Sequence, residues 1–202
     1  MAQDLENVSR ETMDRLRIYS ELLKKWNPKI NLVSRSSLSE LWSRHIVDSH
    51  QIFDLAPESA THWLDLGSGG GFPGMVVAIL AQEAKSPQKV TLVESDTRKC
   101  VFLRTVARET GVEVTVLNER IEKLPPLEAD VVSARALADL DQLLNYVSLH
   151  MKPAGRAILP KGKTWEKELK SAQLKWNFDF RVVRSKTEVG SVILNIEGVS
   201  SE

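Results

Sequence analysis

The sequence predicts an α/β protein with a mostly parallel seven-stranded sheet, a C-terminal antiparallel hairpin and an N-terminal helical extension. Three observations support this prediction. Short apolar runs alternate with helical patterns, a glycine-rich turn follows the first of these runs, and two further apolar runs come near the end of the chain. Of the 202 residues, 42% are hydrophobic and 27% are charged, which is typical of one globular domain.

The first sixty residues carry two amphipathic helical patterns. Apolar residues recur at helical spacing over Met13–Trp26, and Pro28 is expected to stop this helix because proline has no N–H for the helical ladder. A second helix is expected to begin at the capping-box spacing Ser37-x-x-Glu40 and to run to Phe53. These two helices form the predicted extension.

Five apolar runs of strand length follow, most of them separated by helical patterns: His62–Leu66, Lys89–Glu94, Glu113–Leu117, Asp130–Ser133 and Arg156–Leu159. This alternation predicts a parallel sheet with helices on both faces. A last helix is expected over Trp165–Trp176, followed by a hairpin of Phe178–Arg184 and Ser191–Ile196. We therefore expect a helical extension at residues 1–60 and an α/β core at residues 61–202, together forming one compact unit.

Composition excludes several functional classes. No apolar run approaches the roughly 20 residues that a membrane span needs, and the first residues lack the pattern of a signal peptide, so we expect a cytoplasmic protein. The single cysteine, Cys100, excludes an intrachain disulfide, and the histidine spacing indicates no metal site. The 27 basic and 27 acidic residues balance. Residues 151–202 nevertheless carry 10 basic against 6 acidic residues, which suits nucleic-acid binding or a solvated face.

The segment Trp63–Gly74 is predicted to form a strand, a glycine turn and the start of a helix. Glycine permits positive φ and lets a ligand approach the backbone, and the helix start offers free N–H groups. Gly69-x-Gly71-x-x-Gly74 fits the Rossmann fingerprint, and Glu94 stands 20 residues later, where an acid holds ribose hydroxyls. The turn is therefore predicted to bind a nucleotide or nucleoside in a Rossmann-like fold.

Asp65 narrows the choice of ligand. A carboxylate two residues before Gly67 would repel a pyrophosphate, whereas it suits a cation. S-adenosyl-L-methionine has an adenosine for Glu94, no phosphate, and ammonium and sulfonium charges that could face Asp65. We therefore favour a methyltransferase over a dehydrogenase, for which the chain also offers no second catalytic domain. The alternative for Asp65 is a carboxylate that accepts N–H bonds from the loop.

Two other motifs are weaker. Ala157-x-x-x-x-Gly162-Lys163-Thr164 resembles a degenerate Walker A turn, but its residues are too bulky and strand-like to wrap a phosphate. Cys100 is a conceivable nucleophile, but it begins a helix away from the glycine turn, so a small core or surface thiol is favoured.

The segment Val132–Ala136 restricts the methyl acceptor. It lacks the Pro-Pro-aromatic motif of exocyclic base methylation, the cysteine of pyrimidine carbon methylation and the acid used in ribose methylation. Two kinds of acceptor remain. One is an atom that already has a free lone pair, such as guanine N7, and the other is a group of a small molecule or a protein. For guanine N7 we expect no catalytic base, because N7 is unprotonated at neutral pH and the enzyme must supply only positioning.

Several segments resemble one family, over roughly residues 20–196. They are Trp26–Leu32, Arg44–Ser49, Asp65–Gly74, Leu92–Leu103, Ser133–Ala136 and Leu159–Gly162. In these segments the chain resembles the glucose-inhibited division protein B family, the bacterial small-subunit ribosomal RNA methyltransferases G. The resemblance implies a class I methyltransferase fold, S-adenosyl-L-methionine as donor, and N7 of guanine 527 of 16S ribosomal RNA as acceptor.

The resemblance also implies roles for single residues. Gly67 and Phe72 would line the donor site, Glu94 would hold the ribose, Ile121 and Glu122 would border the adenine, and Arg135 would lie beside the donor. With Asp65, Gly69 and Gly71 these residues make up the expected cofactor site. Phe72 has an alternative as a core residue under the turn, and Arg135 has one as an ion-pair partner of Asp130 or Asp139.

Four residues are candidates for contacts with RNA: Arg44, His45, Lys161 and Lys163. Alternatives stay open, since Arg44 and Asp48 have the i,i+4 spacing of an ion pair, His45 lies on an apolar stripe, and Lys161 suits a solvated strand end. An arginine that grips guanine O6 and N7 would cover the reacting atom. We therefore expect recognition through O6 alone, through the Watson–Crick edge, or by stacking on Phe72 or Trp26.

The expected partner is 16S ribosomal RNA or the small ribosomal subunit, bound by a monomer without membrane contact. Two rival functions remain at this point. One is a methyltransferase on the same core that acts on a small molecule or a protein. The other is an RNA-binding protein without activity that keeps the glycine turn as a relic.

Overall fold

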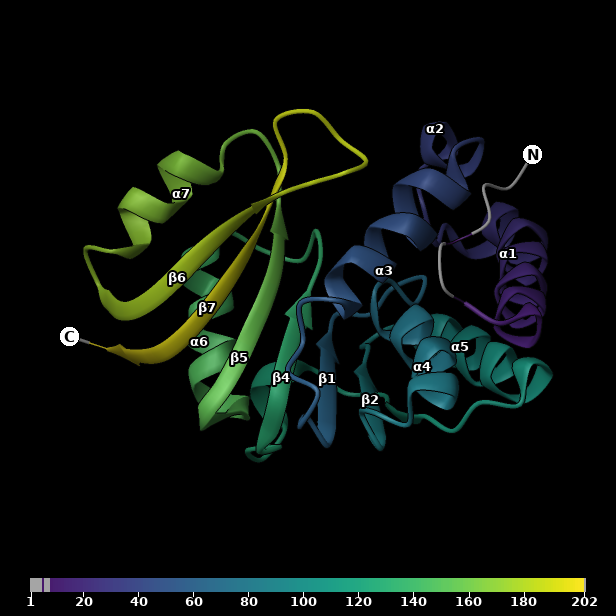
Figure 1. Cartoon of the computed structure of the whole chain (residues 1–202), viewed down its shortest axis with the longest axis horizontal. Coiled ribbons are helices and arrows are strands. Elements are labelled where there is room, and N and C mark those ends of the chain that lie inside the picture. The colour runs from purple at the N-terminus through teal and green to yellow at the C-terminus, as the bar shows by residue number, and fades with distance from the viewer. Residues whose placement is uncertain (1–4, 6–7, 202) are drawn as a thin grey trace.

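The computed structural model describes residue 5 and residues 8–201, and its centre is one seven-stranded sheet (Figure 1). The strand order is β3-β2-β1-β4-β5-β7-β6. Strands β1 to β5 run parallel, and β7 pairs antiparallel with both β5 and β6. This confirms the predicted α/β class, the mostly parallel sheet and the closing hairpin. The strands are β1 (His62–Leu66), β2 (Lys89–Val93), β3 (Thr115–Leu117), β4 (Ala129–Ala134), β5 (Met151–Lys161), β6 (Trp176–Arg184) and β7 (Val192–Ser201).

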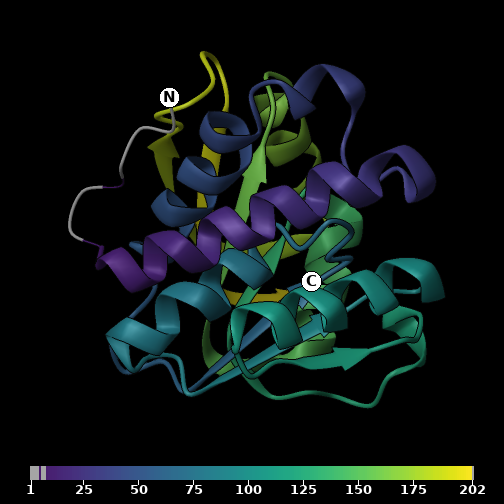
Figure 2. The same ribbon diagram turned by 90° about the vertical axis from the view of Figure 1, so that its right-hand side faces the viewer.

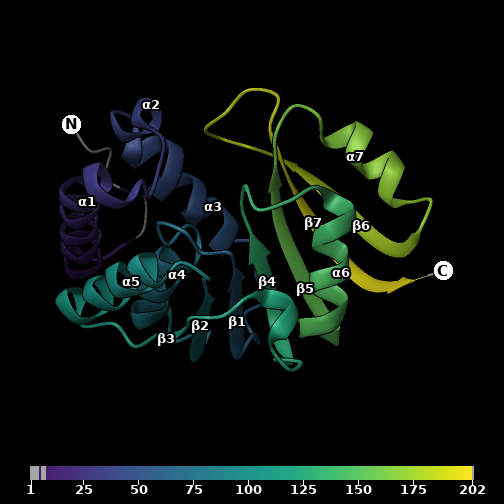
Figure 3. The same ribbon diagram turned by 180° about the vertical axis from the view of Figure 1, so that it is seen from behind.

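Helices cover both faces of the sheet (Figures 1 and 3). One face carries α1, α3, α4 and α5, and Figure 2 shows α1 lying across α4 and α5. The opposite face carries α6 and α7. No described helix is long and apolar enough to span a membrane. The helical segments are α1 (Arg10–Ile30), α2 (Arg35–Leu38), the π-helical η1 (Trp42–Val47), α3 (Asp48–Phe53), α4 (Gly74–Ala84), α5 (Thr97–Thr110), the 3₁₀-helical η2 (Ile121–Lys123), α6 (Leu140–His150) and α7 (Trp165–Ala172).

The hydrophobic core lies in two layers, one on each side of the sheet. Alternate side chains of a strand point to opposite faces, so Trp63 joins the layer under α1, α4 and α5, while Leu64 joins the layer under α6. Every residue of β1 is buried, as expected for a strand at the centre of a parallel sheet. The N-terminal helices share the first layer with the sheet, because Leu16 and Leu23 of α1 are fully buried within it.

Helix α1 runs past the proline that was expected to stop it. Pro28 lies inside the helix, which ends at Ile30. Asn31 then takes a left-handed conformation with φ of 50°, and its N–H donates to the Asn27 carbonyl. The Asn27 side chain accepts the next two backbone N–H groups, of Leu32 and Val33, at 2.8 Å each. The predicted end was wrong because these side-chain bonds cap the helix one turn later than Pro28 suggested.

The single second helix predicted from Ser37 to Phe53 is also wrong. The chain forms the short α2 and then η1 and α3, and Ser34 is the N-cap that accepts the Ser37 N–H at 3.2 Å. Two carbonyls of η1 accept hydrogen bonds from side chains. The Arg44 carbonyl accepts from Arg135 at 3.2 Å, and the His45 carbonyl accepts from the Ser49 hydroxyl at 2.6 Å.

The last predicted helix is shorter than expected. Helix α7 ends at Ala172, and Trp176, assigned to the helix by its spacing, begins β6. The indole N–H of Trp176 donates to Asp141 of α6 at 2.9 Å, so the side chain still packs on the helical layer. The spacing of Trp176 therefore predicted correctly that it packs in this layer, but wrongly that it belongs to the helix and not to a strand.

Tyr19 joins α1 to the glycine turn between β1 and α4. Its side chain is fully buried, its hydroxyl donates to the Gly70 carbonyl, and its ring centroid lies 5.2 Å from that of Phe72. The helical extension therefore supports the turn from behind.

We predict that Tyr19→Phe lowers the free energy of unfolding by about 1–3 kcal/mol, because the buried Gly70 carbonyl loses its donor. Urea denaturation followed by circular dichroism measures this change. Tyr146→Phe is the control, since no described residue hydrogen-bonds its hydroxyl. Equal stability of both variants would show that the Tyr19 hydroxyl does not hold the turn.

Candidate functional site

A cavity of about 830 Å³ opens at the carboxyl ends of β1, β2, β4 and β5. The connections from β1 and β4 lead to opposite sides of the sheet, which is where open α/β sheets bind ligands. The size is in the range of small-molecule sites. The cavity wall contains these predicted site residues: Arg44, His45, Gly67, Gly69, Phe72, Glu94, Ile121, Glu122, Arg135 and Lys161.

The glycine turn needs its glycines for different reasons. Gly67 and Gly69 line the cavity with φ of 65° and 55°, and a Cβ on Gly67 would come within 2.6 Å of Leu137. Gly71, with φ of 97°, does not line the cavity, and a Cβ there would lie 2.7 Å from the Tyr19 hydroxyl. Gly71 therefore permits close packing of α1, and its predicted part in the cofactor site stays a prediction.

Glu94 connects the turn to the end of β2. One carboxylate oxygen accepts the Gly69 N–H at 2.9 Å and the other accepts the Asp96 N–H at 2.8 Å. The residue is 7% exposed and lines the cavity. An ionised carboxylate offers about four acceptor positions, so lone pairs remain for two ligand hydroxyls. The fold thus orients the acid that was predicted to hold a ribose.

Asp65 does not lie in the cavity wall. Its side chain is completely buried, and it accepts the Ser133 hydroxyl at 2.7 Å, while the Trp63 indole N–H donates to that hydroxyl at 2.8 Å. Burial raises the pKa of Asp65 to about 6, although hydrogen bonds such as that from Ser133 oppose the shift. The expected direct contact with a cationic ligand is therefore corrected. Strand β1 ends at Leu66, as predicted, so Asp65 lies within the strand.

Three side chains stack at the floor of the cavity. The Phe72 ring lies 4.8 Å from the His45 ring, and the Arg135 guanidinium lies 5.1 Å from the Phe72 centroid. Burial, and then the charges of Arg135 and Arg44, lower the pKa of His45 to about 3. His45 is therefore neutral at pH 7, and its ring nitrogens have no hydrogen-bond partner among the described residues.

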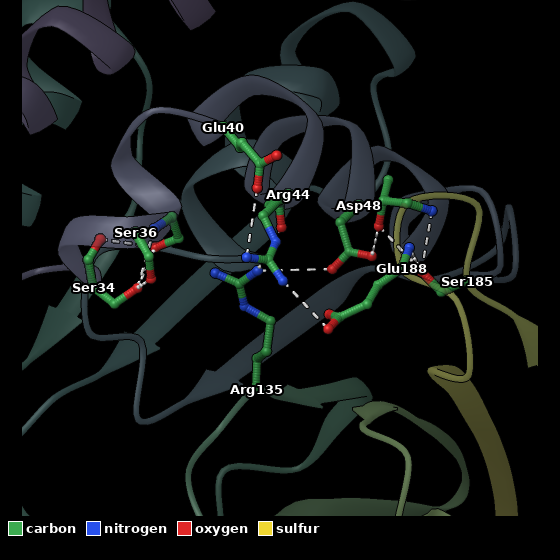
Figure 4. Close-up of polar contacts among 10 residues, drawn as sticks. Ser34, Ser36, Glu40, Arg44, Asp48, Arg135, Ser185 and Glu188 are labelled. Atoms are coloured by element: carbon green, nitrogen blue, oxygen red, sulfur yellow. Dashed lines mark hydrogen bonds and ion pairs between the residues drawn. The ribbon is translucent and has the colours of Figure 1, made fainter.

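The two arginines have other partners than those predicted (Figure 4). Arg135 pairs with Asp48 at 3.7 Å and not with Asp130 or Asp139. Arg44 pairs with Glu40 at 3.6 Å and Glu188 at 3.3 Å, and not with Asp48. Asp48 instead bonds Arg135 and the Thr187 hydroxyl.

The family model that matches residues 12–194 is described as GidB, rRNA small subunit methyltransferase G. The chain belongs to this family. A relative from Ruegeria sp. (strain TM1040), named ribosomal RNA small subunit methyltransferase G, is 57% identical over 96% of this chain and 94% of its own length. A protein of the same name from Ruegeria pomeroyi is 54% identical over 96% of this chain and 95% of its own length.

Solved structures confirm the Rossmann-like architecture. The ribosomal protein L11 methylase from Lactobacillus delbrueckii subsp. bulgaricus matches with a TM-score of 0.60. The match covers 77% of this chain and 79% of that chain at 15% identity. An identity this low shows a shared fold and nothing finer.

The two lysines predicted to contact RNA, Lys161 and Lys163, differ from each other in their surroundings. The Lys161 side chain is only 8% exposed, pairs with Glu168 at 2.5 Å and donates to the Ala138 carbonyl at 3.1 Å. Lys161 is thus not a solvated strand end, and its predicted contact with RNA stays a prediction. Lys163 is exposed outside the cavity wall. Trp26 packs on Phe102 at 5.7 Å and does not line the cavity.

The weaker motifs are resolved as expected. Cys100 is fully buried, and burial raises the pKa of its thiol, which disfavours the reactive thiolate. Residues Ala157 to Lys161 of the Walker-like segment belong to β5 and form no phosphate loop.

Several residues at the site were missed by sequence reasoning. Tyr19, Gln51, Thr187 and Glu188 support or border the cavity through contacts between distant parts of the chain. A tyrosine on the apolar stripe of α1 gave no signal beyond core packing, and the acid in the hairpin turn looked like an ordinary solvated residue.

We predict that Asp65→Asn removes one pH-dependent contribution to stability. The folded-state pKa of about 6 lies above the unfolded value of 3.8, so the folded protein gains stability from this group as pH falls. The contribution is complete below the unfolded pKa and is lost as pH rises through about 6. Between pH 8 and pH 5 the difference in unfolding free energy between wild type and variant should change by roughly 1 kcal/mol. Parallel pH profiles of the two proteins in urea denaturation would contradict the assignment.

Proposed function

We propose that this chain transfers the methyl group of S-adenosyl-L-methionine to N7 of guanine 527 in 16S ribosomal RNA. The observation that carries the proposal is membership of the ribosomal RNA small subunit methyltransferase G family over nearly the whole chain. The site fits that activity, because the glycine turn and Glu94 meet at the edge of the sheet where this fold binds ligands.

The donor half of the proposed site lies between the turn and η2. Gly67 and Gly69 allow a ligand to approach the backbone, Glu94 can accept two ribose hydroxyls, and Ile121 and Glu122 border the space for an adenine. When bound, S-adenosyl-L-methionine supplies a methyl group on a positively charged sulfur. Asp65 acts from behind the turn, where it positions Ser133 and contributes negative charge without touching the ligand.

The acceptor half lies toward η1 and the end of β4. Guanine N7 already has a free lone pair, so this chain needs to orient the base and exclude water. His45 agrees with that requirement, since a group with a pKa of about 3 holds no proton at neutral pH and is a poor general base. We assign no catalytic base. Phe72 is buried beneath His45, so the half-buried His45 ring is the one that can offer a face to the target base, and Arg44 and Arg135 offer positive charge for RNA.

The proposal includes the setting of the reaction. The substrate is 16S ribosomal RNA, free or within the small subunit, and the protein acts in the cytoplasm as a monomer. The basic C-terminal quarter and the exposed Lys163 are suited to RNA phosphates outside the cavity.

Incubation of 16S ribosomal RNA with labelled donor, followed by mass mapping of RNA fragments, tests the proposal. We expect one added methyl group on the fragment that contains guanine 527. Methyl transfer to a small molecule or protein, unaffected by added RNA, would support the first rival function. Absence of saturable S-adenosylhomocysteine binding in calorimetry would support the RNA-binding relic.

We predict that replacing N7 of the target guanine by carbon abolishes turnover and leaves RNA binding nearly unchanged. The substituted base keeps its shape, its Watson–Crick edge and O6, and it loses only the reacting lone pair. Methyl transfer and competitive binding of the same RNA measure the two effects. Loss of binding would show that N7 is a recognition contact.

We predict that Glu94→Ala weakens S-adenosylhomocysteine binding by about 1–3 kcal/mol, because two hydrogen bonds to a charged acceptor are lost. Isothermal calorimetry measures the affinity. Glu113→Ala, an exposed acid outside the cavity wall, is the matched control and should bind normally. An unchanged affinity in Glu94→Ala would remove this carboxylate from the donor site.

A further inference from the structure

Arg44 lies at the mouth of the cavity between two carboxylates. Its guanidinium is 3.6 Å from Glu40 and 3.3 Å from Glu188, and Figure 4 shows the two acids approaching it from different sides. The Arg44 and Glu188 side chains are 36% and 49% exposed. Exposed ion pairs are weak, so the Glu188 contact is easily exchanged for another anion.

The loop that carries Glu188 is fastened by other, buried contacts. The Gln51 amide of α3 donates to the Arg184 carbonyl at 2.8 Å and accepts the Lys186 N–H at 2.9 Å. The Thr187 hydroxyl donates to Asp48 at 3.0 Å. Gln51 and Asp48 are 5% and 9% exposed. The loop between β6 and β7 therefore keeps its place when the Glu188 side chain moves away from Arg44.

A second cation lies beside Arg44. Arg135 donates to the Arg44 carbonyl at 3.2 Å and is paired with the buried carboxylate of Asp48. Asp48 holds Arg135, whereas the acids that face Arg44 are both exposed. An anion that entered the cavity mouth would thus displace Glu188 without breaking a buried pair. Arginine binds a phosphate through two parallel N–H bonds, which an RNA phosphodiester can accept.

We propose that Arg44 binds a phosphodiester of the RNA substrate and that Glu188 occupies its guanidinium in the free protein, so that RNA binding must displace Glu188. This inference rests on the proposed function, because it takes RNA as the substrate. It predicts that the acid lowers the affinity of the enzyme for its own substrate. It also accounts for an acid at the edge of a cavity that receives a polyanion.

The test is Glu188→Gln, which keeps the shape of the side chain and removes its charge. The KM for 16S ribosomal RNA should fall by up to about fivefold, the factor equivalent to ~1 kcal/mol, with kcat unchanged. The slope of the logarithm of RNA affinity against the logarithm of salt concentration should become steeper by up to about one, which corresponds to one more released ion. In the wild type the displaced Glu188 takes up a cation as the phosphate releases one, and the variant lacks this offset.

Two further variants isolate the contact. Glu109→Gln removes an exposed acid paired with Arg108 on α5, outside the cavity wall, and controls for the change in net charge. Arg44→Gln alone should weaken RNA binding, and adding Glu188→Gln to it should give no gain, because the two residues act through one contact. Thermal melting of each variant verifies that it is folded.

The inference is overturned if Glu188→Gln leaves the KM unchanged or raises it, if Glu109→Gln gives the same gain, or if the gain persists with Arg44→Gln. Binding of a fluorescein-labelled 16S transcript, read by anisotropy, separates this inference from the proposed function. Tighter binding of Glu188→Gln without methyl transfer by any variant would support the displacement and reject the activity. Methyl transfer by the wild type with no tighter binding of Glu188→Gln would support the activity and reject the displacement.

Discussion

The hydrogen bond from the Gly69 N–H to the Glu94 carboxylate fixes the glycine turn against the end of β2, and the donor site depends on it. The other oxygen of Glu94 holds the Asp96 N–H, so the acid cannot rotate without releasing a backbone group. Tyr19 holds the opposite side of the turn at Gly70. The acid proposed to bind ribose is therefore oriented by the fold before any ligand enters.

The substrate side is built differently, from irregular structure. The π-helical turn of η1 offers the Arg44 carbonyl to Arg135, and Asp48 links Arg135 to the β6–β7 loop through Thr187. The N-terminal helices and the C-terminal hairpin thus meet across the cavity mouth. A site assembled from both ends of the chain suits a substrate much larger than the donor.

The sequence was sufficient for the sheet, the glycine turn and the position of Glu94 beside that turn, because each depends on local pattern and on a topological rule. It was insufficient for Asp65, because the strand was predicted correctly but its spacing does not reveal that Ser133 of β4 and the start of α4 enclose the carboxylate. The partners of Lys161 and Arg135 were not predictable either. Glu168 and Asp48 reach them through tertiary packing, and nothing in the spacing of residues 42–47 distinguishes a π-helix from an α-helix.

A crystal structure determined after soaking with S-adenosylhomocysteine and, separately, with nicotinamide dinucleotide tests the central claim most directly. We predict S-adenosylhomocysteine along the glycine turn, with both ribose hydroxyls within hydrogen-bond distance of the Glu94 carboxylate and the adenine beside Ile121. The dinucleotide should leave the cavity empty. A dinucleotide bound at the turn, with S-adenosylhomocysteine absent from its own crystals, would contradict the account.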